Sequence, residues 1–123
     1  MRIIGGIEAE NDKLIQLWAK RQRSYVSGRP ADCGHHYFSR RCELLRWDLK
    51  NIIPLTLVEH TRIHSGSIKY NVKNPCNLLY LRRMFNKNFK DYLLENNLTK
   101  EEFALKCNKK LKEALSAEDT ENV

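Results

Sequence analysis

The sequence of 123 residues lacks three features, each typical of a different class of protein. No apolar run approaches the roughly 20 residues that a membrane-spanning helix needs. The first residues, MRIIGGIEAEND, lack the apolar stretch of a signal peptide. The four cysteines form no C-x-x-C pair, which excludes a four-cysteine zinc knuckle. We therefore expect a cytoplasmic protein with no membrane partner, whose cysteines are buried thiols and not disulfides: Cys33, Cys42, Cys76 and Cys107.

Basic residues are present in excess. The formal net charge is +7, the isoelectric point is about 9.4, and 30% of the residues are charged. A basic chain attracts polyanions, and nucleic acid is the commonest polyanion inside cells. The length predicts one domain over residues 1–123, and the charge favours a nucleic-acid partner.

The order of apolar periods and turn signals predicts an α+β fold. An amphipathic pattern predicts an N-terminal helix over 8–26, which Ser27-Gly28-Arg29-Pro30 ends. Short β-like pieces at 37–38 and 44–47 predict a small hairpin, with Ile52-Ile53 as a further apolar pair.

Capping signals predict the later helices. Thr56 and Glu59 form a capping box that opens a helix over 56–65. Pro75 and a second capping box, Thr99 and Glu102, mark helices within 74–116. The acidic residues 117–123 are expected to be a disordered tail.

All four histidines lie between residues 33 and 64. His60 and His64 are four apart on the predicted helix, so both side chains lie on one face and can bind one ion. His35 and His36 are adjacent, and neighbours in an extended chain point to opposite faces. Either one completes a three-ligand set while the other faces a substrate. Three ligands with an open position are typical of a catalytic metal site.

The histidine outside the ligand set is a candidate general base, because its pKa lies near neutrality. Asn51 lies between the two histidine pairs. Its amide can hold a loop, or it can fix the tautomer of the base by a hydrogen bond.

The pattern H-H, then N, then H-x-x-x-H, crossing a hairpin into a helix, resembles the HNH or ββα-metal endonucleases. Its spacing is similar to that in the DNase domains of nuclease colicins. The resemblance implies a ββα-metal core over 31–66, with the N-terminal helix before it and the helical tail after it. It also implies metal ligation by His35, His60 and His64, a general base at His36, and a brace for the metal loop at Asn51.

The flanking segments GHHYFSRR, LRWDLKN and PLT are similar to those of phage-encoded, recombination-associated HNH nucleases. Asn74-Pro75 matches the start of their helical tail, although two C-x-x-C pairs that many relatives carry are missing. This similarity implies a DNA endonuclease of the host cytoplasm that acts on duplex or branched DNA in phage recombination, repair or processing. Candidate phosphate contacts are Arg40, Arg41 and Arg46.

The expected cofactor is one divalent metal ion, with Mg²⁺ or Mn²⁺ suited to phosphodiester chemistry and Zn²⁺, Ni²⁺ or Co²⁺ suited to imidazole ligands. One such site cuts one strand, so double-strand cleavage requires a homodimer or two encounters. The alternative is a non-catalytic, zinc-stabilised nucleic-acid-binding module, in which Cys33 or His35 closes a site with His60 and His64. A protein-interaction domain leaves the histidine cluster unexplained. A separate basic cluster is either a phosphate contact or a solvated face: Arg82, Arg83, Lys87 and Lys90.

Overall fold

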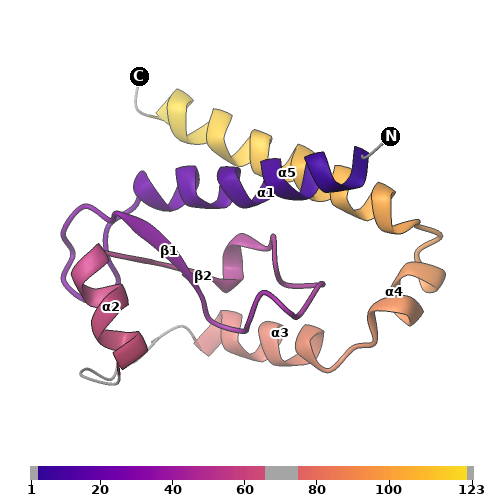
Figure 1. Ribbon diagram of the computed structural model, residues 1–123, viewed down its shortest axis with the longest axis horizontal. Coiled ribbons are helices and arrows are strands. Elements are labelled where there is room, and N and C mark those ends of the chain that lie inside the picture. The colour runs from indigo at the N-terminus through magenta and orange to yellow at the C-terminus, as the bar shows by residue number, and fades with distance from the viewer. Residues whose placement is uncertain (1–2, 66–74, 122–123) are drawn as a thin grey trace.

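The computed structural model describes the backbone of residues 3–65 and 75–121 and the side chains of residues 6–63 and 78–117. The fold is α+β, as the sequence predicts, and none of the described helices is long and apolar enough to cross a membrane. The elements run in the order α1 (Ile3–Lys20), β1 (Cys33–His36), the 3₁₀ turn η1 (Leu49–Asn51), β2 (Ile52–Leu55), α2 (Leu57–Ser65), α3 (Pro75–Phe85), α4 (Phe89–Glu95) and α5 (Lys100–Glu121) (Figure 1).

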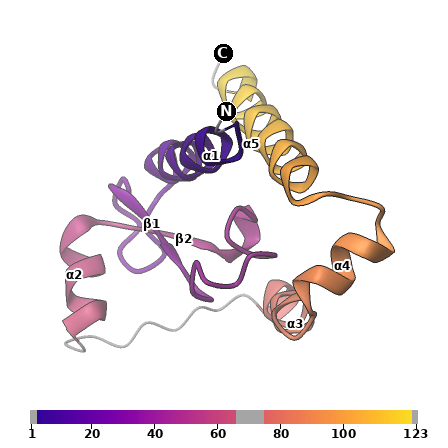
Figure 2. The ribbon, with the colours of Figure 1, turned by 45° about the vertical axis from the view of Figure 1, so that its right-hand side comes forward.

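Helices α1 and α5 lie side by side and form one layer of the molecule (Figures 1 and 2). Ile15 and Ala19 of α1 are buried in one apolar cluster with Phe103 and Leu111 of α5. A buried amide also crosses the interface, since Asn11 donates from Nδ2 to the carbonyl of Ala104 at 3.1 Å. The two helices pack together because each carries apolar residues at helical spacing, which form one apolar face.

The second layer is the two-stranded antiparallel sheet, which packs against α1. Strand β1 pairs with β2 from Cys33 opposite Leu55 to His36 opposite Ile52. The predicted hairpin exists, but its predicted strands are wrong: 37–38 and 44–47 lie in turns. Leu44 and Leu45 are buried there without strand pairing, because turns can direct apolar side chains into a core as well as strands can.

The capping predictions are confirmed. In the first box the Thr56 N–H donates to Glu59 at 2.9 Å, and the Glu59 N–H donates to Thr56 Oγ1 at 3.2 Å. The second box, Thr99 with Glu102, has the same reciprocal bonds, at 2.8 and 3.0 Å. Helix α3 begins at Pro75, as expected of a residue with no N–H to leave unpaired.

The terminal helices differ from the prediction. Helix α1 spans Ile3–Lys20 instead of 8–26, and residues 21–32 form turns that return the chain to the sheet. Helix α5 continues to Glu121, past the end expected near 116 and into the tail 117–123. The longer α5 packs beside α1, where the Arg21 side chain donates to the carbonyl of Leu115 at 3.1 Å.

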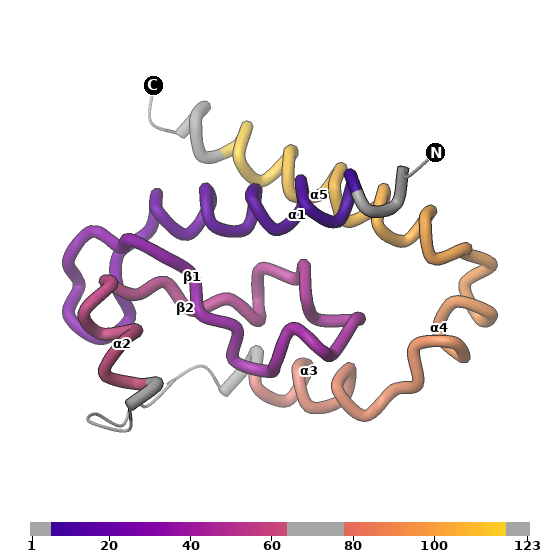
Figure 3. Tube along the Cα trace, in the orientation of Figure 1, coloured from indigo at the N-terminus to yellow at the C-terminus, as the bar shows by residue number. Residues whose placement is uncertain are grey.

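Helices α3 and α4 form an arc that carries the chain from the far side of the sheet back to α5 (Figure 3). The turns after β1 lie between α1 and this arc. Asp48 links these turns to α3. It caps η1 by accepting from the Lys50 N–H, and it accepts a hydrogen bond from the Tyr80 hydroxyl of α3. The position of α3 is thus tied to the turns that border the histidine cluster.

The three cysteines with described side chains are free thiols: Cys33, Cys42 and Cys107. We expected them to be buried, but each is only half-buried. Burial raises the pKa of Cys107 to about 11. The side chain of Cys76 lies outside the described residues.

Candidate active site

His35 and His60 meet between the sheet and α2. Their ring centroids lie 5.3 Å apart with an angle of 65° between the ring planes. Two imidazoles that bind one tetrahedral ion through nitrogens about 2.0–2.1 Å away place their centroids roughly 5 Å apart. The centroid distance of the two rings, which meet edge to face, matches that of two imidazoles on one ion.

His64 is in α2, four residues after His60, but its side chain lies outside the described residues. The described side chains alone include no group of three or more His, Cys, Asp or Glu that could hold a metal. The backbone of α2 places His64 one turn from His60, on the same side of the helix. The donor set His35, His60 and His64 fits a divalent ion by its chemistry, since all three donors are imidazoles.

His36 is turned toward the loop that follows its strand. Its Nε2 atom lies 2.8 Å from the carbonyl oxygen of Arg46. A carbonyl only accepts, so Nε2 carries the proton of the neutral ring and Nδ1 holds the lone pair. Burial lowers the pKa of His36, and the hydrogen bond to Arg46 opposes that shift only in part. The ring is therefore mainly neutral at neutral pH and can accept a proton at Nδ1.

Asn51 is completely buried and holds the loop between the two strands. Its Nδ2 donates to the carbonyls of Phe38 at 3.0 Å and Leu45 at 3.1 Å, and its Oδ1 accepts from the Phe38 N–H at 2.8 Å. Of the two roles considered from the sequence, the geometry matches the loop brace. The His36 tautomer is fixed by the Arg46 carbonyl instead.

Asp12 of α1 is a residue that the sequence analysis missed. It accepts hydrogen bonds from Arg46 Nε at 3.2 Å and Nη2 at 2.7 Å, from Trp47 Nε1 at 2.9 Å, and from Arg40 Nη2 at 3.1 Å. Burial alone would raise the pKa of Asp12, but the hydrogen bonds from Arg46 and Trp47 outweigh it and the pKa is lowered. No sequence signal singles out Asp12, because Glu8 and Glu10 are on the same helix.

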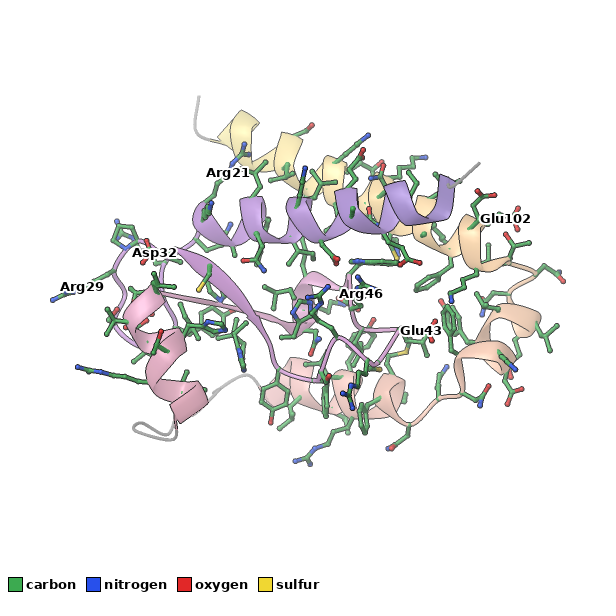
Figure 4. The ribbon with its side chains drawn as sticks, in the orientation of Figure 1. Arg21, Arg29, Asp32, Glu43, Arg46 and Glu102 are labelled. Carbon is green, nitrogen blue, oxygen red and sulfur yellow. The ribbon has the colours of Figure 1, made fainter. Side chains whose placement is uncertain are left out.

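The three arginines proposed from the sequence have different surroundings. Arg46 lies between α1 and the turns, where it pairs with Asp12 and approaches Glu8 at 3.6 Å (Figure 4). The Arg40 side chain is 60% exposed, so one face of it is accessible although it contacts Asp12. Arg41 is exposed. Arg40 is therefore the best placed of the three for a phosphate, and Arg46 is mainly a structural tie.

The histidines of β1 and α2 that have described side chains, together with Asp12 and Arg40, line one open cleft of about 650 Å³. Its walls come from α1, β1, the following turns and α2: Asp12, Gln16, Gly34, His35, His36, Tyr37, Ser39, Arg40 and His60. Gln16 positions the strand, since its amide accepts from the Gly34 N–H at 2.8 Å and donates to the Gly34 carbonyl at 3.2 Å. Both backbone polar groups of Gly34 therefore bond to Gln16 on the side of β1 away from β2, where a further strand would otherwise pair.

The cleft combines a histidine pair at metal-binding spacing, a neutral histidine held in one tautomer, and an accessible arginine. That set can hold a cation, deprotonate a water and bind an anion. Comparisons with models of protein families, with curated proteins and with solved structures find no match for the chain. The cleft and the motif are therefore the features that indicate a function.

Proposed function

We propose that the protein is a metal-dependent DNA endonuclease of the HNH type, which hydrolyses phosphodiester bonds with one divalent ion. The observation that carries the proposal is the hydrogen bond from His36 Nε2 to the Arg46 carbonyl, beside the His35–His60 pair. It leaves Nδ1 as the proton acceptor of a histidine that lines the same cleft as the two candidate ligands. The motif H-H, N, H-x-x-x-H supports the same function.

Each residue then has one part in the reaction. His36 takes a proton from the attacking water through Nδ1. His35, His60 and His64 hold the ion, which when bound neutralises charge on the scissile phosphate and on the leaving oxygen. Arg40 binds a phosphate oxygen at the edge of the cleft. Asn51 keeps the loop that carries the Arg46 carbonyl in place.

The donors and the reaction favour different ions. Imidazole nitrogens suit Zn²⁺, Ni²⁺ and Co²⁺, while hydrolysis of phosphodiesters by similar sites suits Mg²⁺ or Mn²⁺. We propose Mg²⁺ or Mn²⁺ for activity. A single site cuts one strand, so the first product from a supercoiled plasmid is the nicked circle, and linear product requires a homodimer or a second encounter.

A structural zinc site in a DNA-binding module is the competing function. The Cys33 thiol is a poor candidate for its fourth ligand, because burial, followed by Asp32 and Glu59, raises its pKa, and Sγ already lies 3.6 Å from the carbonyl of Leu55. Zinc binds the thiolate, which a raised pKa disfavours. A structural zinc site also gives no role to His36, whose Nδ1 is left able to accept a proton.

The test is nicking of supercoiled plasmid and cleavage of a four-way junction in Mg²⁺, Mn²⁺ or Zn²⁺. Wild type is compared with His36→Ala and His36→Gln, since glutamine retains an N–H donor for the Arg46 carbonyl but supplies no base. We expect nicking by wild type only, and unchanged DNA binding by both variants. Cleavage in no metal, or equal cleavage by the variants, would contradict the proposal.

A further inference from the structure

A second surface, on α3 and the loop after β1, is made of aromatic and basic side chains. Phe85 is 49% exposed at the end of α3 and stacks on Phe38, with centroids 4.6 Å apart and ring planes 21° apart. Arg82 lies one turn before Phe85 and is exposed, as is Arg83 beside it. We call Phe38, Phe85 and Arg82 the stacking platform. Arg83 lies on another face of α3 and adds to the basic charge around the platform.

The stacking platform adjoins the cleft. Tyr37 lines the cleft and meets the edge of Phe38 at 5.0 Å between centroids. Phe38 in turn stacks on Phe85, so a row of three rings leads from the cleft to α3. Figures 1 and 3 show α3 beside the turns that follow β1. Asn51 and Asp48 hold the loop and α3 in this relation through the hydrogen bonds to Phe38 and Tyr80.

The charge of the platform is not neutralised within the described chain. Arg40 and Arg46 in the cleft both pair with Asp12, whereas Arg82 and Arg83 make no ion pair with any described residue. Lys87, between α3 and α4, and Lys90, in α4, are also exposed. Exposed arginines beside an exposed ring are the arrangement that binds the backbone and the bases of a single strand together.

We propose that the stacking platform binds an unpaired segment of DNA next to the scissile phosphate. The inference rests on the proposed function for its choice of DNA, and it names the substrate class as DNA with a single-stranded stretch. Phe85 stacks on a base, which must be unpaired to reach a ring on the protein surface, and Arg82 binds an adjoining phosphate. Arg83, on the neighbouring face of α3, attracts the next part of the strand. A duplex offers phosphates to the arginines but no free base to Phe85.

The test measures binding without metal, in EDTA, so that no strand is cut. Fluorescence anisotropy compares a labelled oligothymidylate with a duplex of the same length. We expect Phe85→Leu to weaken single-strand binding about tenfold and to leave duplex binding unchanged. Phe85→Tyr retains the ring and should bind like wild type. The double variant Arg82→Gln/Arg83→Gln should lower the salt slope of single-strand binding by about 0.7 for each arginine.

The matched control is Lys106→Gln/Lys109→Gln, which removes two exposed charges from α5 and should leave single-strand affinity close to wild type. Equal loss in this control, wild-type binding by Phe85→Leu, or equal weakening of duplex binding would overturn the inference. Polyglutamate serves as a second probe, in place of an acidic protein. If the Phe85 and arginine variants bind DNA like wild type but bind polyglutamate more weakly, the platform binds an acidic protein and the inference is overturned. If wild type does not nick DNA but Phe85→Leu still weakens single-strand binding, only the proposed function is overturned.

Discussion

The Nε2 atom of His36 lies 2.8 Å from the carbonyl oxygen of Arg46, and this hydrogen bond orients the imidazole ring of the candidate base. Asp12 holds the Arg46 side chain, and Asn51 holds the neighbouring carbonyl of Leu45. The turn that orients His36 is thus fixed from α1 and from the start of β2. Changes at these residues should therefore affect the reaction without touching the metal ligands.

The pH dependence of nicking should report His36. Burial lowers its pKa in the folded protein, and a bound cation would shift it in the same direction. The base is inactive when protonated, so the nicking rate should rise with pH through a midpoint below the ordinary histidine value of 6.5 and then level off. Initial rates at fixed metal concentration measure this, and a rate that keeps rising well above neutrality would assign the proton transfer to another group.

Asp12→Asn should lower nicking more than it lowers metal binding. Asparagine has nearly the volume of aspartate but is neutral and offers Arg46 one acceptor oxygen instead of two, so the ion pair is lost. Hydrogen bonds to charged groups contribute about 1.5–3 kcal/mol each. We expect lower stability to urea, a nicking rate about tenfold lower because His36 is less well oriented, and unchanged metal affinity. Glu10→Gln is the control, since Glu10 faces Asn108 and Lys112 of α5. Equal nicking by both variants would exclude Asp12 as a positioning residue.

Gly34→Ala should separate α1 from the sheet. A Cβ at Gly34 would lie 2.6 Å from Ile52 Cγ2 and 3.0 Å from Ala19 Cβ, so the strand, Ile52 or α1 must shift to make room. Overpacking of this kind costs about 1–3 kcal/mol, measured as a lower urea midpoint. Gly6→Ala, where no atom lies within 4 Å of the new Cβ, should instead stabilise the helix by about 0.5–1 kcal/mol. A Gly34 variant as stable as wild type would show that the close approach does not matter.

Glu59→Gln should lower stability above pH 4.5, and its difference from wild type should shrink as the pH falls toward 2. Burial would raise the pKa of Glu59, but hydrogen bonds from Ser24, Ser27 and Thr56 outweigh it and lower the pKa to about 2. A lowered pKa in the folded state stabilises the fold above the unfolded value of 4.5, and that stability is lost as the pH falls from 4.5 toward 2. Urea unfolding of both proteins between these limits should show the steeper acid loss in wild type, and parallel curves would contradict the assignment.

Local signals were sufficient to predict the helices of the second half. Thr56 with Glu59 and Thr99 with Glu102 carry their own partners three residues away, so each helix start could be predicted without knowledge of the fold. The buried stripe of α5, with Phe103, Leu111 and Leu115, follows from helical spacing in the same way.

Long-range contacts could not be predicted so directly. The strands at Cys33–His36 and Ile52–Leu55 pair across the whole loop, and Pro54 in β2 is tolerated because it faces Gly34 without a ladder hydrogen bond. Asp12 contacts Arg46 across 34 positions, and the sequence gives no signal for that pairing. The histidine roles came from the motif, while the partner that orients His36 came only from the structure.

The central claim is that His36 acts on water while the other histidines hold the ion. The most direct measurement compares Mn²⁺ affinity by calorimetry with plasmid nicking for His36→Gln and His60→Ala. We predict that His36→Gln binds Mn²⁺ like wild type and nicks about 10²–10⁴-fold more slowly, and that His60→Ala loses both binding and nicking. Nicking by His36→Gln at the wild-type rate, or full Mn²⁺ binding by His60→Ala, would contradict the claim.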